Sequence, residues 1–317
     1  MMYDVIVYGP IFCDLIFTDL PRMPTPGTEI FAGDLAASLG GSAIVAAVLH
    51  TLGVRVGLIA ELGSDPFSDL LRRLLDESGL DRSLIREHPH PLPQVTVALS
   101  FPGDRAFVTR FQRPATPPDL ATILRTHPAK HLHVCSFLAA LETPNACDIA
   151  HAAGMTVSMD PGWDEAALRD PRLAAMIADL DLFMPGEMEL QHIAGAPDMA
   201  TAITETLAAM RRGVLVLKQG ATGATAHSRN GQPPVHVPAL AVQAIDTTGA
   251  GDAFDAGFLS RFVHGASLDV CMRAGVACGG IAVTTPGITR ALVNFKGMEA
   301  WLAKLPSSAV AAPTRPA

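Results

Sequence analysis

Short β-branched runs alternate with helical patterns along most of this 317-residue chain. Gly53, Gly79 and Gly154 each follow a periodic apolar segment, which is where a helix ends. Such an alternation predicts a mostly parallel sheet covered by helices on both faces. Strands are expected at Val5–Tyr8, Val54–Glu61, His131–Ser136, Thr156–Met159, Asp181–Met184, Val214–Lys218 and Ala224–His227, and helices near 41–52, 66–78, 145–153, 198–212, 252–264 and 267–284.

Two segments interrupt this alternation. The first, about 11–37, is rich in proline and glycine and shows no helical period. The second, about 93–113, holds two β-like runs around the turn Pro102-Gly103-Asp104. We expect the two segments to pair as a small β lid over one edge of a single domain spanning 1–305. The remaining residues, 306–317, are rich in Ala, Pro and Ser and are expected to be disordered.

Composition excludes several classes of function. The net charge is −8, and no cluster of Lys and Arg is longer than a pair, so nucleic acid and anionic membranes are poor partners. The start of the chain has no signal-peptide pattern, and the longest near-apolar run, Ala274–Val283, is too short to span a bilayer. A soluble cytoplasmic protein is therefore expected. The five cysteines are widely spaced and indicate buried thiols, with neither a disulfide framework nor a zinc site.

The stretch from Asp246 to Phe254 joins three small residues to a carboxylate and then to an apolar helical pattern. A helix that begins there directs its first backbone N–H groups and the positive end of its dipole toward those small residues. An anion site is therefore expected at Gly249, Ala250 and Gly251, where glycine lets a phosphate approach closely. Asp252 lies at its rim. We expect this carboxylate to accept a proton from a hydroxyl group that attacks a bound phosphoryl group.

Other interpretations of this stretch fit less well. A plain N-cap aspartate needs no run of three small residues before it. A dinucleotide-binding fingerprint would need a small residue where Phe254 stands, and would follow the first strand. A Walker-type P-loop is excluded because no Gly-x-x-x-x-Gly-Lys-Ser/Thr stretch occurs.

The same stretch resembles the signature of the ribokinase-like (PfkB) carbohydrate kinase family, and the resemblance covers about residues 3–295. Gly40–Ala47, Leu62–Phe67 and Leu141–Pro144 are similar to other blocks of the family. The resemblance implies a three-layer α/β/α fold with a mostly parallel central sheet. It also implies an ATP-dependent kinase that uses Mg²⁺ and phosphorylates a hydroxyl of a small sugar or sugar-like molecule. Family members carry a lid at this place and often dimerise through it, so a homodimer is expected.

Carboxylates and exposed backbone can bind the hydroxyls of an acceptor. Asp14 follows the first strand, where open α/β sheets bind ligands, and it matches the family's sugar-binding Asp; a turn acid is the alternative. Gly40 and Gly41 precede a helix and would let the backbone approach a sugar. By resemblance, Glu142 and Asp255 lie near the substrate or phosphate. The alternatives are a surface acid for Glu142 and a solvated first-turn acid for Asp255.

Two residues depart from the family pattern. Val45 stands where the family usually has an Asn that binds sugar hydroxyls, so substrate choice should differ and D-ribose is disfavoured. Gly186 replaces the Asn of the family's Asn-x-x-Glu stretch, in which Glu189 is kept. The resemblance implies that Glu189 acts on Mg²⁺ through water, whereas a plain helix-start role is the alternative.

The resemblance also implies a nucleotide site and a site for a monovalent cation. Nucleotide contacts are expected from Lys218, Gly220, Gly223, Val276 and Gly279, with a phosphate role for Lys218 left open. A K⁺ ion would lie between the loop with Asp246 and Thr248 and the loop that ends at Gly287.

Two further functions stay open on the sequence. A nucleoside kinase of the same fold would need aromatic side chains for a base, and Phe101, Phe107 and Phe111 are available in the expected lid. A non-catalytic member that binds a sugar or nucleotide would explain the loss of the two Asn residues. His131 and His133 lie on one strand face, and with no third ligand nearby we interpret them as packing residues.

Overall fold

The computed structural model describes residues 2–102, 104–305 and 309–310. Its largest feature is a sheet with the strand order β14-β13-β12-β11-β10-β9-β8-β1-β4-β5. Neighbours from β11 to β5 pair in parallel, and β12, β13 and β14 extend one edge in antiparallel fashion. The strands are β1 (Tyr3–Tyr8), β4 (Val56–Leu62), β5 (Ile85–Glu87), β8 (Ala129–Cys135), β9 (Thr156–Asp160), β10 (Leu182–Phe183), β11 (Val214–Lys218), β12 (Ala224–Ser228), β13 (Val235–Val237) and β14 (Ala309–Val310).

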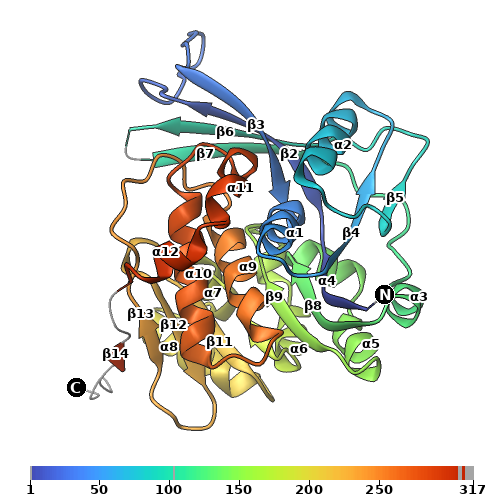
Figure 1. The fold of residues 1–317 in the computed structure, drawn as a ribbon, viewed down its shortest axis with the longest axis vertical. Helices are drawn as coiled ribbons and strands as arrows, with labels where there is room; N and C mark the ends of the chain where they lie inside the picture. Colours follow the sequence, from blue (N-terminus) through green and yellow to red (C-terminus); the bar gives the residue numbers. More distant parts are fainter. Residues whose placement is uncertain (1, 103, 306–308, 311–317) are drawn as a thin grey trace.

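Helices cover both faces of this sheet (Figure 1). One face carries α1 (Ser42–Thr51), α2 (Pro66–Ser78), α9 (Ala250–Phe262), α10 (Leu268–Ala282), α11 (Ile288–Phe295) and α12 (Met298–Leu302). The other carries α3 (Leu120–Thr126), α4 (Phe137–Glu142), α5 (Ala146–Ala152), α6 (Leu173–Ala178), α7 (Glu187–Ala194) and α8 (Met199–Ala209).

Side-chain alternation along the strands creates two separate cores. In β1, Val5 and Val7 pack with the α9 side, whereas Ile6 and Tyr8 pack with the α5 side. A strand buried on both faces needs a continuous run of apolar residues, and β1 has one from Val5 to Tyr8. The three-layer α/β/α fold expected from the sequence is confirmed.

A second, smaller sheet stands at one end of the domain, at the top of Figure 1. It consists of β2 (Ile11–Thr18), β3 (Asp34–Gly41), β6 (Gln94–Phe101) and β7 (Asp104–Phe111), in the order β3-β2-β6-β7. Strand β2 pairs antiparallel with β3 and parallel with β6, and β6 pairs antiparallel with β7. The two irregular segments of the sequence do pair with each other, as expected of a lid.

The lid is tied to the C-terminal helices by α11. The Thr289 hydroxyl accepts a hydrogen bond from the Leu39 amide at 3.0 Å, and the Thr289 amide donates to Ser38 Oγ at 3.2 Å. At the first residue of β3, Asp34 Oδ2 lies 2.7 Å from Nη1 of Arg290, the next residue of α11. These contacts join two segments about 250 residues apart in the chain.

Several expectations differ from the structure in detail. Asp14 lies within β2 of the lid and not in a loop after β1, because β2 begins only three residues after β1 ends. The short elements β5, β13, α6 and α12 carried no recognisable period in the sequence. Gly103 of the expected lid turn lies outside the described residues. So does most of the tail, although Ala309–Val310 is described and pairs with β13.

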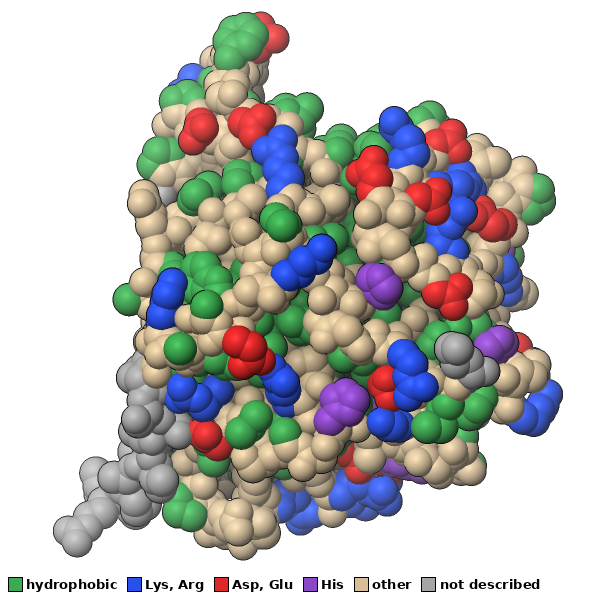
Figure 2. Space-filling model, viewed as in Figure 1, with side chains coloured by type: hydrophobic (Ala, Val, Ile, Leu, Met, Phe, Trp, Pro, Cys, Tyr) green, Lys and Arg blue, Asp and Glu red, His purple; other side chains and the backbone are tan. Residues whose placement is uncertain are grey.

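The described residues show mixed charges on one face and free, mostly buried cysteines. Figure 2 shows Lys and Arg intermixed with Asp and Glu over the face that carries α9 to α12. The cysteines are free, and only Cys147 is not fully buried. None of the helices in the described ranges combines the length and hydropathy that a bilayer span requires.

Candidate active site

Helix α9 begins within the run of small residues where an anion site is expected. Gly249 caps the helix with a φ of 72°, a left-handed conformation that favours glycine. Its α-carbon faces Ile44, and a side-chain carbon there would lie 2.7 Å from Ile44 Cδ1. The first helical hydrogen bond runs from the Ala253 amide to the Gly249 carbonyl at 2.9 Å, and the Ala250 amide lies 3.4 Å from the Thr247 carbonyl. The amides of Gly251 and Asp252 precede that first bond, as an anion cradle requires.

The Asp252 carboxyl, in the first turn of α9, has a strongly perturbed acidity. Burial and then the negative charge of Asp160 raise its pKa to about 7, and Glu189 adds to the effect. The Lys218 cation opposes this rise, as does the residue's own backbone N–H. A carboxylate with a pKa near neutrality can take up a proton at physiological pH, which a surface aspartate does poorly.

Asp14 projects from the lid strand β2 toward the same region. It is 5% exposed, and its carboxylate lies against Gly40 so closely that a side-chain carbon on Gly40 would overlap it. Burial raises the pKa of Asp14 well above its usual range, and the charges of Asp252 and Asp246 raise it further. Asp14 and the α9 carboxylate therefore share one electrostatic environment, although they are far apart in the sequence.

The other expected acceptor residues fall into two groups. Gly41 has a φ of 59° and packs against Pro10 and the Phe12 ring, next to Asp14. Glu142 ends α4 and lines a small, mainly apolar cavity with Tyr8, Gln94 and Phe111, and burial raises its pKa. Val45, in contrast, is 0% exposed and belongs to the apolar core.

Asp255 is not the solvated first-turn acid that was one interpretation of the sequence, because it is 0% exposed. It lies in a buried ion cluster with Lys218, whose Nζ is 3.2 Å from Asp255 Oδ2 and 2.6 Å from Asp160 Oδ2. No role was assigned to Asp160 from the sequence. Its position at the carboxyl end of β9 was the available signal, because ligand sites of parallel sheets gather at that edge.

The two histidines on β8 are buried packing residues, as expected. His131 hydrogen-bonds Thr156 at 2.7 Å and Ser158 at 2.6 Å, and His133 Nδ1 lies 2.7 Å from the same Ser158 hydroxyl. His133 Nε2 has no hydrogen-bond partner among the described residues and lies 4.0 Å from Asp255 Oδ2.

The residues expected to hold a monovalent cation lie together. The buried carboxylate of Asp246 accepts hydrogen bonds from the Thr248 and Gly287 amides, both at 2.9 Å, and thereby joins the two loops. The Thr248 hydroxyl oxygen is buried and has no hydrogen-bond partner in the described part of the chain. An unpaired buried oxygen of this kind is suited to a cation.

Glu189, expected near Mg²⁺, has a local structural role. Its Oε2 accepts a hydrogen bond from the Gly186 amide at 2.6 Å and so caps the start of α7. Burial and the charge of Asp160 raise the pKa of Glu189. No group of three or more His, Cys, Asp or Glu side chains suited to a metal ion occurs within the described residues.

The expected nucleotide residues come from two places. Gly220 begins the short helix η2 (Gly220–Thr222), and Gly223 ends it with a φ of 109° against the Val237 carbonyl. Gly279 belongs to α10, and a side-chain carbon there would lie 3.3 Å from the Ala250 carbonyl. Val276 lies on the same helix and is 6% exposed. Helix α10 therefore contacts the start of α9 at Gly279. Gly220 is exposed, and a side-chain carbon there would have no atom within 4 Å.

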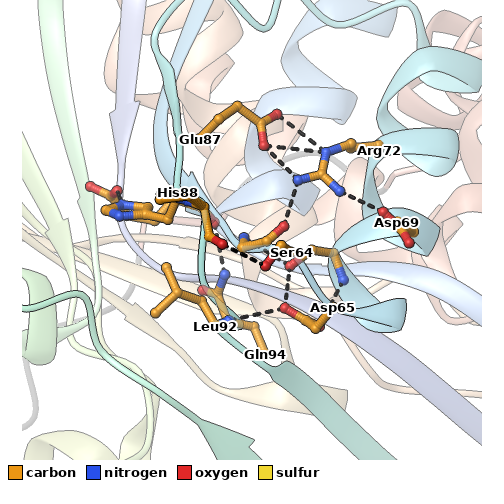
Figure 3. Close-up of polar contacts among 12 residues, drawn as sticks. Ser64, Asp65, Asp69, Arg72, Glu87, His88, Leu92 and Gln94 are labelled. Carbon is orange, nitrogen blue, oxygen red and sulfur yellow. Dashed lines mark hydrogen bonds and ion pairs between the residues drawn. The ribbon is translucent and has the colours of Figure 1, made fainter.

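Figure 3 shows the polar contacts that link the block Leu62–Phe67 to α2 and to the segment before β6. Asp65 caps α2 by accepting from the Phe67 and Ser68 amides at 3.1 Å, and it also accepts from the Leu92 amide at 3.0 Å. Arg72 extends the network to the Gly63 carbonyl and to Glu87. The network ties α2 to the segment that leads into lid strand β6.

Comparison with known proteins agrees with this geometry. The model of the pfkB family carbohydrate kinases matches residues 2–294. A fructokinase of Klebsiella pneumoniae is 33% identical over 275 residues, which cover 80% of this chain and 88% of that protein.

Solved structures show the same fold. The ribokinase of Arabidopsis thaliana, complexed with ribose and ATP, superposes with a TM-score of 0.79 at 22% identity, covering 95% of this chain and 99% of that one. A protein of E. coli described as a ribokinase II, in complex with ATP and Mg²⁺, gives a TM-score of 0.77 at 24% identity and covers 94% of this chain and 99% of its own.

Proposed function

The chain belongs to the pfkB family of carbohydrate kinases and is a phosphotransferase with an alcohol group as acceptor, and from that premise we propose that it transfers the γ-phosphate of ATP to a hydroxyl of a small sugar or sugar-like molecule. One observation carries the assignment to particular residues. Asp252, with a pKa of about 7, lies in the first turn of α9 beside the Gly249–Gly251 loop and in the same electrostatic environment as Asp14.

In this mechanism Asp14 orients the acceptor by binding its hydroxyls. The backbone at Gly40 and Gly41 borders one side of the bound acceptor. Asp252 takes the proton of the attacking hydroxyl as its oxygen bonds to the γ-phosphorus, while the bond from that phosphorus to the β,γ-bridging oxygen breaks and ADP leaves. The Gly249–Asp252 loop holds the developing negative charge by its amides and by the positive end of α9. Glu142 supplies a further hydrogen-bond acceptor from α4.

The residues present fit a Mg²⁺ ion only as a water-mediated partner of the phosphates. Glu189 is the expected carboxylate, and its raised pKa reflects a buried site in which a cation would favour the ionised form. When bound, Mg²⁺ neutralises phosphate charge and keeps much of its own hydration shell.

Nucleotide binding is assigned to Gly220, Gly223, Val276 and Gly279. The left-handed glycines let the backbone between β11 and β12 approach a flat ring or a phosphate closely. The expected contribution of Lys218 is weighed separately below, because its ammonium group is already paired with carboxylates.

A nucleoside acceptor is the second candidate, and the aromatic pair at the base of the lid favours it. Phe12 and Phe111 meet edge to face with ring centroids 5.5 Å apart, next to Gly41 and Asp14. A nucleobase could pack against such rings, whereas a free sugar offers only its C–H face. Phe107, also considered from the sequence, is 46% exposed on the lid.

The decisive experiment is ADP release with ATP and Mg²⁺ over a panel of pentoses, hexoses, sugar acids, sugar phosphates and nucleosides, followed by Asp252→Asn on the best acceptor. Turnover should fall on the order of 10²–10⁴-fold with the fold retained by circular dichroism. Asp69→Asn, which changes an exposed first-turn aspartate of α2, is the matched control. An Asp252→Asn enzyme as active as the control would remove Asp252 from the role of base.

We also propose a homodimer formed through the lid. Its exposed apolar side chains include Phe31, Leu35, Phe107 and Val108, and Figure 2 shows hydrophobic side chains on the lid at the top of the view. A molar mass near that of one chain in light scattering, together with an unchanged mass for Val108→Lys, would contradict this assembly.

A further inference from the structure

One cation and several carboxyl groups are buried together directly behind the anion loop. Lys218, at the end of β11, has its Nζ within 3.4 Å of three carboxylate oxygens, one from Asp160 and two from Asp255. Asp160 ends β9 and Asp255 belongs to α9. The contacts of Lys218 therefore join the catalytic helix to two strands of the central sheet.

The position of the ammonium group relative to the loop is defined by Gly251. A side-chain carbon on Gly251 would lie 3.3 Å from Lys218 Nζ, so the cation lies immediately behind the loop. At such short range, and away from water, a single charge acts strongly on the anion site and on Asp252.

The Lys218 ammonium group is already fully engaged. A protonated lysine has three N–H donors, and three carboxylate oxygens surround it. Burial works against its charge, but Asp160, Asp255 and Glu189 outweigh burial and raise its pKa above the usual range. Binding a phosphate directly would require Lys218 to give up at least one of these contacts.

The pKa values of the two aspartates are shifted in opposite directions. Lys218 and hydrogen bonds lower the pKa of Asp160 to about 2 against the effect of burial. Burial raises the pKa of Asp255 well above its range, and a hydrogen bond to Asp160 and the charge of Asp252 reinforce this. A protonated Asp255 that donates to an ionised Asp160 leaves the group of three neutral, as a buried site requires. The other titratable groups around Asp255 are His133, kept neutral by burial, and the Cys135 thiol.

We propose that Lys218 is a positioning residue for phosphoryl transfer: it ties α9 to β9 and β11 through Asp160 and Asp255 and places a fixed positive charge behind Gly251. It acts on the base and the anion loop from within the protein and is not a ligand of the nucleotide. The inference rests on the proposed function of Asp252.

The test is Lys218→Met, which keeps an unbranched side chain one atom shorter than lysine and removes its charge. Turnover should fall about 10²-fold while the KM for ATP changes by less than about threefold, because the lost interaction matters in the transition state. The cation lowers the pKa of Asp252, so its removal should move the acid limb of kcat/KM to higher pH. Ser260→Ala, a buried change on α9, is the control and should retain the wild-type turnover and KM for ATP.

A buried carboxylate left without its cation can prevent folding. The double variant Lys218→Met/Asp160→Asn removes the cation together with its carboxylate partner, so it should fold. Its acid limb should return toward that of the wild type, because one charge of each sign is gone, while turnover stays low because α9 has lost its tie to β11. The ionisation of Asp252 can also be followed without turnover, by carbon-13 NMR of labelled aspartate with the Asp252→Asn protein as the assignment reference.

The outcomes separate the two proposals. A Lys218→Met enzyme with normal turnover and a KM for ATP raised tenfold or more would make Lys218 a nucleotide ligand and overturn the positioning role. Wild-type kinetics in that variant would overturn it as well. If Asp252→Asn abolishes activity in either case, the base assignment stands and only the role of Lys218 falls.

Discussion

The Asp14 carboxylate lies against the backbone of Gly40, in space that any side chain on residue 40 would occupy. Gly40→Ala should therefore displace Asp14 and raise the KM for the acceptor by about tenfold or more, because a hydrogen bond to a substrate hydroxyl is lost. The KM for ATP should change little. Steady-state kinetics with each substrate varied in turn measures both constants. Gly297→Ala, at an open position, is the control, and an unchanged acceptor KM in Gly40→Ala would separate Asp14 from acceptor binding.

The acidity of Asp252 predicts how activity depends on pH. A base must be ionised to accept a proton, and burial with the charge of Asp160 raises the pKa of Asp252 to about 7. As the pH falls through that value, kcat/KM should decrease about tenfold per pH unit. A kcat/KM profile that is flat from pH 8 down to pH 5 would be inconsistent with Asp252 as the base.

The unpaired hydroxyl of Thr248 predicts a dependence on monovalent cations. Thr248→Val removes only that hydroxyl, so stimulation by K⁺ over Li⁺ should disappear while the protein remains folded. Activity titrated with KCl, at constant ionic strength, measures the effect. Thr284→Val, whose hydroxyl already donates to the Ile281 carbonyl, should keep the wild-type response. An equal K⁺ response in both variants would place the cation elsewhere.

Gly257 predicts a purely structural effect at the crossing of α9 and α10. A methyl group there would overlap the Ala274 carbonyl and lie 2.7 Å from Cys278 Sγ, with no space to relax. Gly257→Ala should lower the free energy of unfolding by about 1–3 kcal/mol, as overpacked core variants do. Urea denaturation compares it with Gly297→Ala. If Gly257→Ala had the same free energy of unfolding as that control, α9 and α10 could move apart to accept the methyl group at no cost.

The sequence predicts the repetitive part of this fold well. The bounds of Pro66–Ser78 and Val214–Lys218 match the expectation, because a period of 3.6 or a β-branched run and a terminal glycine are local signals. The lid pairing was also predictable, since segments that break the alternation cannot be buried in the main sheet. Short elements such as Val235–Val237 were missed, because their order depends on a neighbouring strand and not on their own pattern.

For the proposed site, the sequence is most informative where the residues of one motif are adjacent in the chain. The glycine loop before Asp252 is such a motif, since the helix start and the carboxylate are adjacent in sequence. The burial of Asp255 and its pairing with Lys218 could not be read in the same way. A first-turn aspartate faces solvent or core depending on how the helix is rotated against the sheet, and residues far along the chain determine that rotation. Val45 shows the same limit: it was expected near the acceptor, and its side chain is buried in the core.

The contacts between α11 and the lid have a mechanical consequence. Thr289 is hydrogen-bonded to β3 and stands two residues after Gly287, whose amide donates a hydrogen bond to the Asp246 carboxylate. A strand pushed by an incoming acceptor would pull on the turn at Gly287, and a change in that turn would in turn press on the strand. Any movement of β3 would therefore change the geometry around Asp246, and a spectroscopic probe at one position should register events at the other.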